Sequence, residues 1–168
     1  LVYSSKDSCL SLYTDPILWQ GPQQLLGEEI KVYMNDSTID WAHIINQALA
    51  VEMDDSIHYN QVTGKEMKAF FRNGEMHQVD VDGNVLCIYY PVEEGDTTLM
   101  MMDYTESSHL RMVLKDRKLE RGAFIGHTTG VVYPMDQIPA DRLRLDAFAW
   151  FDYVRPRSKE DIFEWRGK

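Results

Sequence analysis

The sequence predicts an all-β fold built from repeated, bent antiparallel hairpins. Three segments align with one another without a gap, at residues 27–46, 64–83 and 107–126. Each segment reads as strand, turn and strand, and each return strand shifts its apolar pattern at the same place. Such self-similarity is typical of stacked units, none of which can bury its apolar face alone. A stacked β-scaffold more often binds or supports other molecules than catalyses a reaction.

The first strand of each copy alternates apolar and polar residues. A period of two places all the apolar residues on one face of a sheet. Lys31, Lys68 and Arg111 stand between them and are expected to point into water on the other face. The inward set consists of Ile30, Val32, Met34, Met67, Ala69, Phe71, Leu110, Met112 and Leu114.

A turn follows each first strand. The turns are centred on residues 35–37 (Asn-Asp-Ser), 72–74 (Arg-Asn-Gly) and 115–117 (Lys-Asp-Arg). Asn73-Gly74 is the strongest hairpin signal in the chain, because both residues tolerate a positive φ. The longer interval between the second and third copies is explained by a turn segment at residues 91–96.

The return strands begin with the apolar residues Ile39, Met76 and Leu119. After these residues, the alternation of apolar and polar positions shifts by one residue. Asp40, His77 and Glu120 align with one another in these return strands. One extra residue at the same place in all three copies predicts a β-bulge that bends the strand. Bent hairpins repeated in register would form a curved, gutter-shaped sheet with an apolar inside.

The rest of the chain is predicted to continue this pattern. Residues 8–19 read as strands broken at Asp15-Pro16, and Gly21-Pro22 reads as a turn. Residues 158–167 are expected to form a short C-terminal helix capped by Ser158. Further strands are predicted at residues 47–53, 58–62, 85–90, 99–104, 130–134 and 145–154.

Composition and charge restrict the function. The 168 residues are enough for one domain with a sizeable core, and 44% of them are hydrophobic, which argues against disorder. The net charge of −10 argues against nucleic-acid binding, which needs a basic patch. No apolar run approaches the roughly 20 residues of a membrane helix. The first residues lack the features of a signal peptide, and we expect the chain to be a piece of a longer protein.

No catalytic or metal-binding pattern emerges. Cys9 and Cys87 are too few for a zinc site and are expected to be buried free thiols, with pairing left open for an oxidising compartment. The segment 80–84 superficially resembles a calcium loop, but its glycine is misplaced and a turn is expected instead. His77 aligns with acidic residues in the other copies and is interpreted as an outward polar position. We therefore expect no enzyme activity, no metal and no cofactor.

The chain also resembles a known family. The pattern Gly-x-Glu-[Ile/Met]-Lys with an Asn/Asp turn recurs, and the chain closes with YPMDQIP, AFAWFDYVRP and FEWRGK. These features resemble the OstA-like proteins of Bacteroidetes-type bacteria, which are relatives of LptA and of the amino-terminal part of LptD in organic solvent tolerance and lipopolysaccharide transport. The resemblance covers roughly residues 15–168, and residues 134–168 resemble a C-terminal portion of such a protein.

The resemblance implies a single β-jellyroll or β-taco domain over residues 1–168, open at its ends and V-shaped in section. Such a domain lies in the periplasm in association with the outer membrane. Its apolar interior carries the acyl chains of lipopolysaccharide, and its edges pair with other domains of the same type. The family has no catalytic residues or cofactor. The nine inward residues become the candidates for lining the lipid groove.

Three alternatives stay open. The inward residues could fill a closed core instead of lining a groove. The chain could be a structural β-module that docks to partner proteins through its edge strands and binds no lipid. It could also be a carbohydrate-binding β-sandwich that uses exposed aromatic residues as a platform, with Trp19, Trp41, Trp150 and Tyr153 as candidates.

Overall fold

The computed structural model describes residues 1–36, 38–93 and 95–164. Ser37 of the first predicted turn, residue 94 of the predicted turn segment and residues 165–168 of the predicted tail lie outside the described residues. In the described part, eleven strands join in one antiparallel sheet, which confirms the all-β prediction. The strands are β1 (Val2–Ser4), β2 (Cys9–Tyr13), β3 (Ile17–Gln20), β4 (Gln23–Leu26), β5 (Glu29–Met34), β6 (Ile39–Met53), β7 (Tyr59–Arg72), β8 (Glu75–Tyr89), β9 (Met101–Lys115), β10 (Lys118–Ile125) and β11 (Thr129–Pro134).

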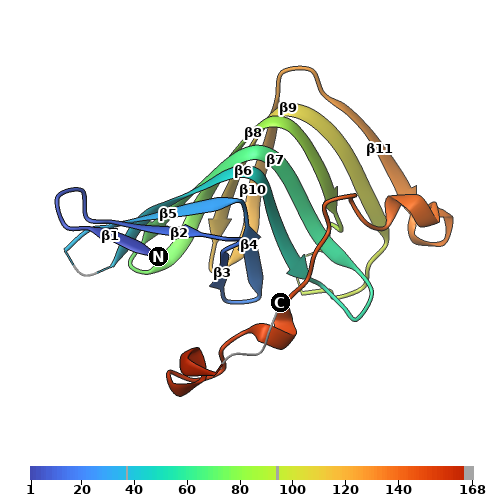
Figure 1. Ribbon diagram of the computed structural model, residues 1–168. Helices are drawn as coiled ribbons and strands as arrows, with labels where there is room; N and C mark the ends of the chain where they lie inside the picture. The colour runs from blue at the N-terminus through green and yellow to red at the C-terminus, as the bar shows by residue number, and fades with distance from the viewer. Residues whose placement is uncertain (37, 94, 165–168) are drawn as a thin grey trace.

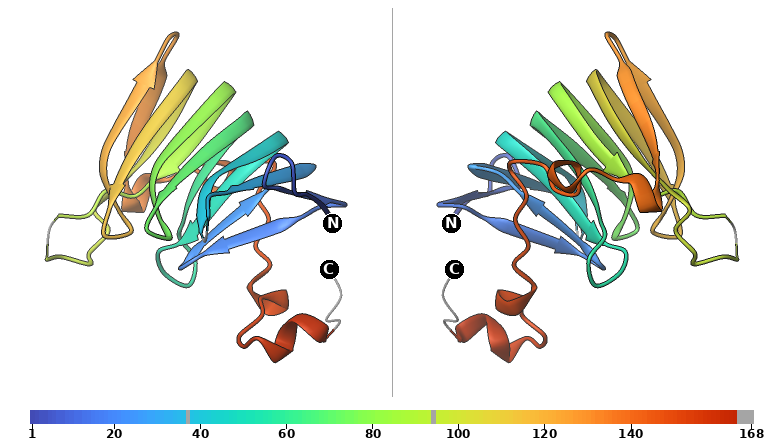
Figure 2. Two further views of the ribbon diagram at one scale, coloured as in Figure 1. Left: turned by 90° about the vertical axis from the view of Figure 1, so that its left-hand side faces the viewer. Right: turned by 90° about the vertical axis from the view of Figure 1, so that its right-hand side faces the viewer.

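The sheet is folded across its middle into two walls that face each other. The long strands β6, β7, β8 and β9 arch over a common ridge, as Figures 1 and 2 show. The first wall holds β1, β2, β5 and β10 with residues 39–45, 66–72, 75–82 and 109–115 of the long strands. The second wall holds β3, β4 and β11 with the remaining halves of the long strands. The three sequence copies are the three hairpins of the first wall.

The predicted bulges are present in all three copies. The pairing register shifts beside Asp40, beside His77 and beside Glu120, each time just after the hairpin turn. The turn prediction also holds where it can be read, since Asn73 and Gly74 have φ angles of 53° and 77°. The shift in the apolar alternation of the sequence therefore corresponds to one extra residue in each return strand.

The sharp fold between the walls lies elsewhere, at a second set of register shifts. Asn46 and Gln47 of β6 have φ angles of 56° and 47°, and Gly83 and Asn84 of β8 have 83° and 50°. Gly126, with a φ of 94°, makes the same corner between β10 and β11. A turn was expected at residues 80–84, which include Gly83 and Asn84. The corner positions bend the strand without reversing it, because the chain continues in the opposite wall and not back along the same one.

Glycine allows the neighbouring strands to approach at this corner. A Cβ on Gly64 would lie 2.5 Å from Val81 Cγ1, and a Cβ on Gly27 would lie 2.6 Å from Ile44 Cγ2. Val81 and Ile44 are both fully buried. The corner therefore has no space for a side chain on the strands that cross beside it.

The C-terminal segment departs from the sequence prediction. Residues 145–154 were expected to form a strand, but they run without sheet pairing across the outer face of the second wall and end in a 3₁₀ turn at Asp152–Val154. Leu145 packs against Ile88, Tyr90 and Met102 there. Further 3₁₀ turns are Met135–Gln137 and Ala140–Arg142.

Two buried glutamines explain why this segment needs no partner strand. Gln24 donates to Ala149 O at 2.9 Å and accepts from Phe151 N–H at 2.8 Å. Gln61 donates to Leu143 O at 3.0 Å and accepts from Leu145 N–H at 2.9 Å. Both glutamines are completely buried, so these amides satisfy backbone groups that a sheet neighbour would otherwise satisfy.

The predicted C-terminal helix is also shorter than expected. In the described residues it is a single 3₁₀ turn, Glu160–Phe163, beside which Ser158 Oγ accepts the backbone N–H of Asp161 at 3.3 Å. No helical segment in the described ranges is long and apolar enough to span a membrane.

Candidate functional site

The inner face of the first wall carries three apolar rows that run across the strands. All nine residues predicted to point inward lie in these rows. The row nearest the corner is Leu12, Ile30, Ile44, Met67, Val81, Leu110 and Phe124. The middle row is Leu10, Val32, Ala42, Ala69, Val79, Met112 and Gly122. The row nearest the hairpin tips is Met34, Ile39, Phe71, Met76, Leu114 and Leu119.

The second wall faces these rows with a shorter apolar row, composed of Leu18, Leu25, Ala50, Val62, Cys87, Thr105 and Gly130. The row changes character along its length. It begins with branched aliphatic side chains and ends, at the β9 and β11 end, with Thr105 and Gly130. Leu25, Ala50, Val62 and Cys87 of this row border a cavity between the walls, whereas Thr105 and Gly130 do not.

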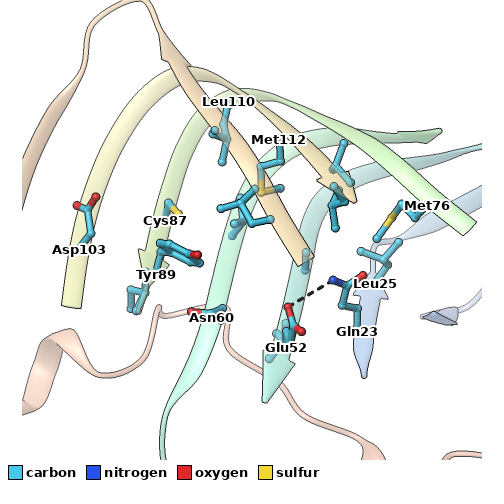
Figure 3. Close-up of a pocket in the computed structure, with 18 of the residues that line it drawn as sticks. Gln23, Leu25, Glu52, Asn60, Met76, Cys87, Tyr89, Asp103, Leu110 and Met112 are labelled. Carbon is cyan, nitrogen blue, oxygen red and sulfur yellow. Dashed lines mark hydrogen bonds between the residues drawn. The ribbon is translucent and has the colours of Figure 1, made fainter. Parts of the chain in front are cut away.

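The cavity between the walls has a volume of about 260 Å³. Figure 3 shows Leu110, Met112, Cys87 and Met76 on the strands that surround it. Its lining comes from β4 and β6 to β10 and comprises Gln23, Leu25, Ala50, Val51, Glu52, Asn60, Val62, Met76, Val79, Cys87, Ile88, Tyr89, Asp103, Leu110, Met112, Leu114, Leu119, Gly122 and Phe124.

The structure divides the nine predicted candidates into two groups. Leu110, Met112 and Leu114 line the cavity. The other six do not: Ile30, Val32, Met67, Ala69 and Phe71 are at most 6% exposed, Met34 is partly buried, and all six belong to the packed core. In the sequence analysis, the inward residues could either fill a closed core or line a groove. In the structure, some of them fill the core and others line the cavity, in different parts of the same face.

Most of the lining was missed by the sequence analysis. Leu25, Val62 and Cys87 come from the second wall, and Leu119 and Phe124 come from the return strand of the third copy. The alternation of apolar and polar residues in the strand segments between the copies could have identified these inward side chains. It was used only to predict strands.

One rim of the cavity is polar. Along the second wall, Gln23 pairs with Glu52, Glu52 pairs with Asn60, and Tyr89 pairs with Asp103. Gln23 Nε2 donates to Glu52 Oε2 at 3.3 Å, as the dashed line in Figure 3 shows. Burial raises the pKa of Glu52, because a desolvated carboxylate is destabilised in its charged form.

The two cysteines are free and buried, as expected. Cys87 lines the cavity, and burial raises the pKa of its thiol to about 12. The thiol is therefore protonated and a poor nucleophile at neutral pH. Cys9 pairs with Tyr33 on the first wall, away from the cavity.

The tip of one hairpin of the second wall contacts the first wall. The tip of the β3–β4 hairpin, at Gln20 and Gly21, reaches the hairpin tips of the first wall. Gln20 Nε2 donates to Gly74 O at 3.3 Å, and Gly21 lies against the side chain of Arg117. We call this contact the clasp, because it joins the two walls opposite the corner.

The outer face of the first wall carries rings and ion pairs. The rings of Tyr33 and Trp41 stack with centroids 4.2 Å apart and planes 4° apart, and the ring of Phe70 lies 6.3 Å from that of Trp41. The stacked faces of Tyr33 and Trp41 cover each other.

Trp19 packs edge-on against Trp150, with ring centroids 5.8 Å apart. The ring of Tyr153 lies 6.2 Å from that of Phe151, so all four aromatic residues proposed for carbohydrate stacking are engaged with other rings.

The segment that resembled a calcium loop lies within β8. Arg111 donates to both carboxylate oxygens of Asp80, at 2.7 and 2.9 Å, and His109 pairs with Asp82. Within the ranges that the structure describes, no three potential metal ligands come together. The carboxylates of Asp80 and Asp82 therefore form ion pairs on the outer face.

Comparison with known proteins gives one informative match. No family model matches the chain, and no curated protein matches its sequence. The crystal structure of LptH, the LptA-homologous periplasmic component of the conserved lipopolysaccharide transport device from Pseudomonas aeruginosa, superposes with a TM-score of 0.57. The match has 11% sequence identity and covers 79% of this chain and 90% of LptH. The chain therefore shares the open, bent β-jellyroll-like fold of LptA-type proteins.

Proposed function

We propose that this chain is a periplasmic domain that binds the acyl chains of lipopolysaccharide non-covalently in the groove between its walls. The observation that carries the proposal is the largely apolar cavity of about 260 Å³ between the two walls. Burying an acyl chain there gains about 0.8 kcal/mol for each methylene removed from water. A groove lined by Leu110, Met112 and Phe124 supplies that environment without any covalent chemistry.

The edges of the sheet support a role in a longer assembly. β10 and β11 both pair with β9, and no described strand pairs with their other edges. Ile125, Val131 and Val132, which are 50–58% exposed, lie on these two strands. Edge strands of another OstA- or LptA-type domain could pair with both walls at once and extend the groove.

The family and the location are part of the proposal. The recurring motifs favour an OstA-like protein of the Bacteroidetes type, with residues 1–168 as one domain and its last part as a C-terminal portion. LptH is a periplasmic component of a lipopolysaccharide transport device, and the shared fold supports a periplasmic location for this chain, in association with the outer membrane.

Site-specific photo-crosslinking tests the proposal. A photoreactive residue replaces Met112 or Phe124, which line the cavity, and Lys68 on the outer face serves as control. After irradiation with lipopolysaccharide, we expect adducts at the two inward positions and none at Lys68. Val32 is unsuitable for this purpose, since it is packed in the core at 3% exposure.

A second function is supported by the exposed edge residues. If the inward variants fold, as judged by circular dichroism, but capture no lipid, the transport proposal fails. Ile125, Val131 and Val132 would then favour the structural alternative, in which the edge strands dock to a partner protein and no lipid binds.

A further inference from the structure

The charged groups of the cavity all have the same sign. Glu52 and Asp103 line it, together with Gln23, Asn60 and Tyr89, and no lysine, arginine or histidine of the described residues does so. The basic residues at the hairpin tips of the first wall, such as Lys115 and Lys118, are exposed and do not line the cavity. The polar part of the cavity therefore offers carboxylates and amide or phenol groups and no positive charge.

These polar groups form a continuous row across four strands, one from each of β6, β7, β8 and β9. At about 4.8 Å per strand, Glu52 and Asp103 stand roughly 14 Å apart, at the two ends of the row. Opposite the row, Leu114, Leu119 and Met76 of the first wall are apolar. A chain that lies in the cavity therefore brings the group at its end against this row.

Local contacts keep the carboxylates in place. Glu52 is held by Gln23, and Asp103 Oδ1 accepts the hydroxyl of Thr105 at 2.7 Å. Asn60 Oδ1 accepts the backbone N–H of Tyr90 at 2.9 Å, which leaves its amide group as a possible partner for a ligand. None of these contacts brings a positive charge that would neutralise the row.

We propose that the cavity selects chains whose polar end donates hydrogen bonds and carries no negative charge, such as a hydroxyl or an amide. A carboxylate or phosphate attached directly to the chain would face two like charges in a partly desolvated site, where repulsion is far less screened than in water. A hydroxyl or amide would instead donate to Glu52 or Asp103. The phosphates of a lipopolysaccharide would remain outside the cavity. This inference rests on the proposed binding of acyl chains.

Calorimetric titration of the purified chain with decanol, decanamide and decanoate at pH 8 tests the selection. These probes have the same chain length and differ only at the polar end. We expect decanol and decanamide to bind at least about tenfold more tightly than decanoate, because two carboxylates act on the anion at moderate distance. Equal binding of all three, or tighter binding of decanoate, would overturn the inference and leave the proposed function standing.

Two matched double variants locate the effect. Glu52→Gln/Asp103→Asn removes both carboxylates from the cavity, and we expect it to tighten decanoate binding while decanol binding stays the same. Glu66→Gln/Asp82→Asn makes the same change of charge on the outer face, and we expect no effect. If the outer variant tightened decanoate binding equally, net charge would explain the preference and the inference would fail. If neither the probes nor lipopolysaccharide bound the wild-type chain, the proposed function itself would fail.

Discussion

Replacing Gly122 by valine tests whether the cavity is the binding site. Gly122 lines the cavity on β10, beside Met112, and a Cβ built on it would meet no atom within 4 Å. The three added carbons would occupy space that the ligand otherwise uses. Displacing about three methylenes of a bound chain costs roughly 2.4 kcal/mol, at 0.8 kcal/mol each, which is about a 50-fold loss of affinity.

The same substitution should stabilise the unliganded protein. A valine gains strand propensity over glycine, worth about 0.5–1 kcal/mol, and buries part of a side chain whose complete burial is worth about 1.5–3 kcal/mol. Because the position is exposed at the open end of the groove, we expect a net gain of about 1.5 kcal/mol, or roughly 3–6 °C in Tm.

Calorimetric titration with lipopolysaccharide and a thermal unfolding scan measure the two effects. Ala123→Val is the matched control, because it adds volume at the next position of the same strand, on the outer face. Lower affinity with higher Tm for Gly122→Val alone is the expected result. Undiminished affinity in a folded Gly122→Val variant would refute the assignment of the cavity as the binding site.

Three further substitutions test the account of the fold. Gln61→Leu removes the hydrogen bonds to the backbone of Leu143 and Leu145, and we expect a loss of about 1–3 kcal/mol in urea unfolding and faster proteolysis of the C-terminal segment. Gly64→Ala places a Cβ 2.5 Å from Val81 Cγ1, and we expect about 1–3 kcal/mol of destabilisation in the same assay. Glu52 has a raised pKa in the folded state, so the folded protein binds more protons there than the unfolded chain. Its stability contribution is lost as pH rises from the unfolded value of 4.5 through the raised one, and Glu52→Gln should lose less stability over that interval.

Each of these substitutions has a control in the same chain. Gln78→Leu changes a glutamine of the outer face whose side chain donates to Asp80 on the same strand. Gly122→Ala adds a methyl group where space is open. Glu66→Gln removes a carboxylate from the outer face of the first wall. Equal effects of a control and its partner would show that the named contact does not cause the change.

The sequence predicted the hairpins because their signals are local. The slip in apolar pattern predicted a bulge in each return strand, and the structure places these bulges at Asp40, His77 and Glu120. The turn predicted at Asn73-Gly74 is also present. The corner could not be distinguished from a turn, because residues that tolerate a positive φ suit both. Whether the chain reverses there or continues into another wall depends on strands far along the sequence.

Long-range partners also explain the other errors. Residues 145–154 have the aromatic composition of a strand, but Gln24 and Gln61 bind their backbone from distant strands. In the candidate site, the inward direction of every predicted residue was correct. Which of them line the cavity depends on the side chains that face them from the opposite wall, and a pattern within one strand carries no information about that.

The most direct test of the groove is methyl NMR of the protein with labelled methionine during titration with lipopolysaccharide. Met76 and Met112 line the cavity, Met67 is buried in the packed core, and Met53 and Met100 are exposed. The account predicts shifts at Met76 and Met112, little change at Met67, and none at Met53 and Met100. It also predicts that deacylated lipopolysaccharide leaves all the signals in place. Shifts confined to the exposed methionines, or equal shifts with the deacylated sugar, would contradict a groove that binds acyl chains between the walls.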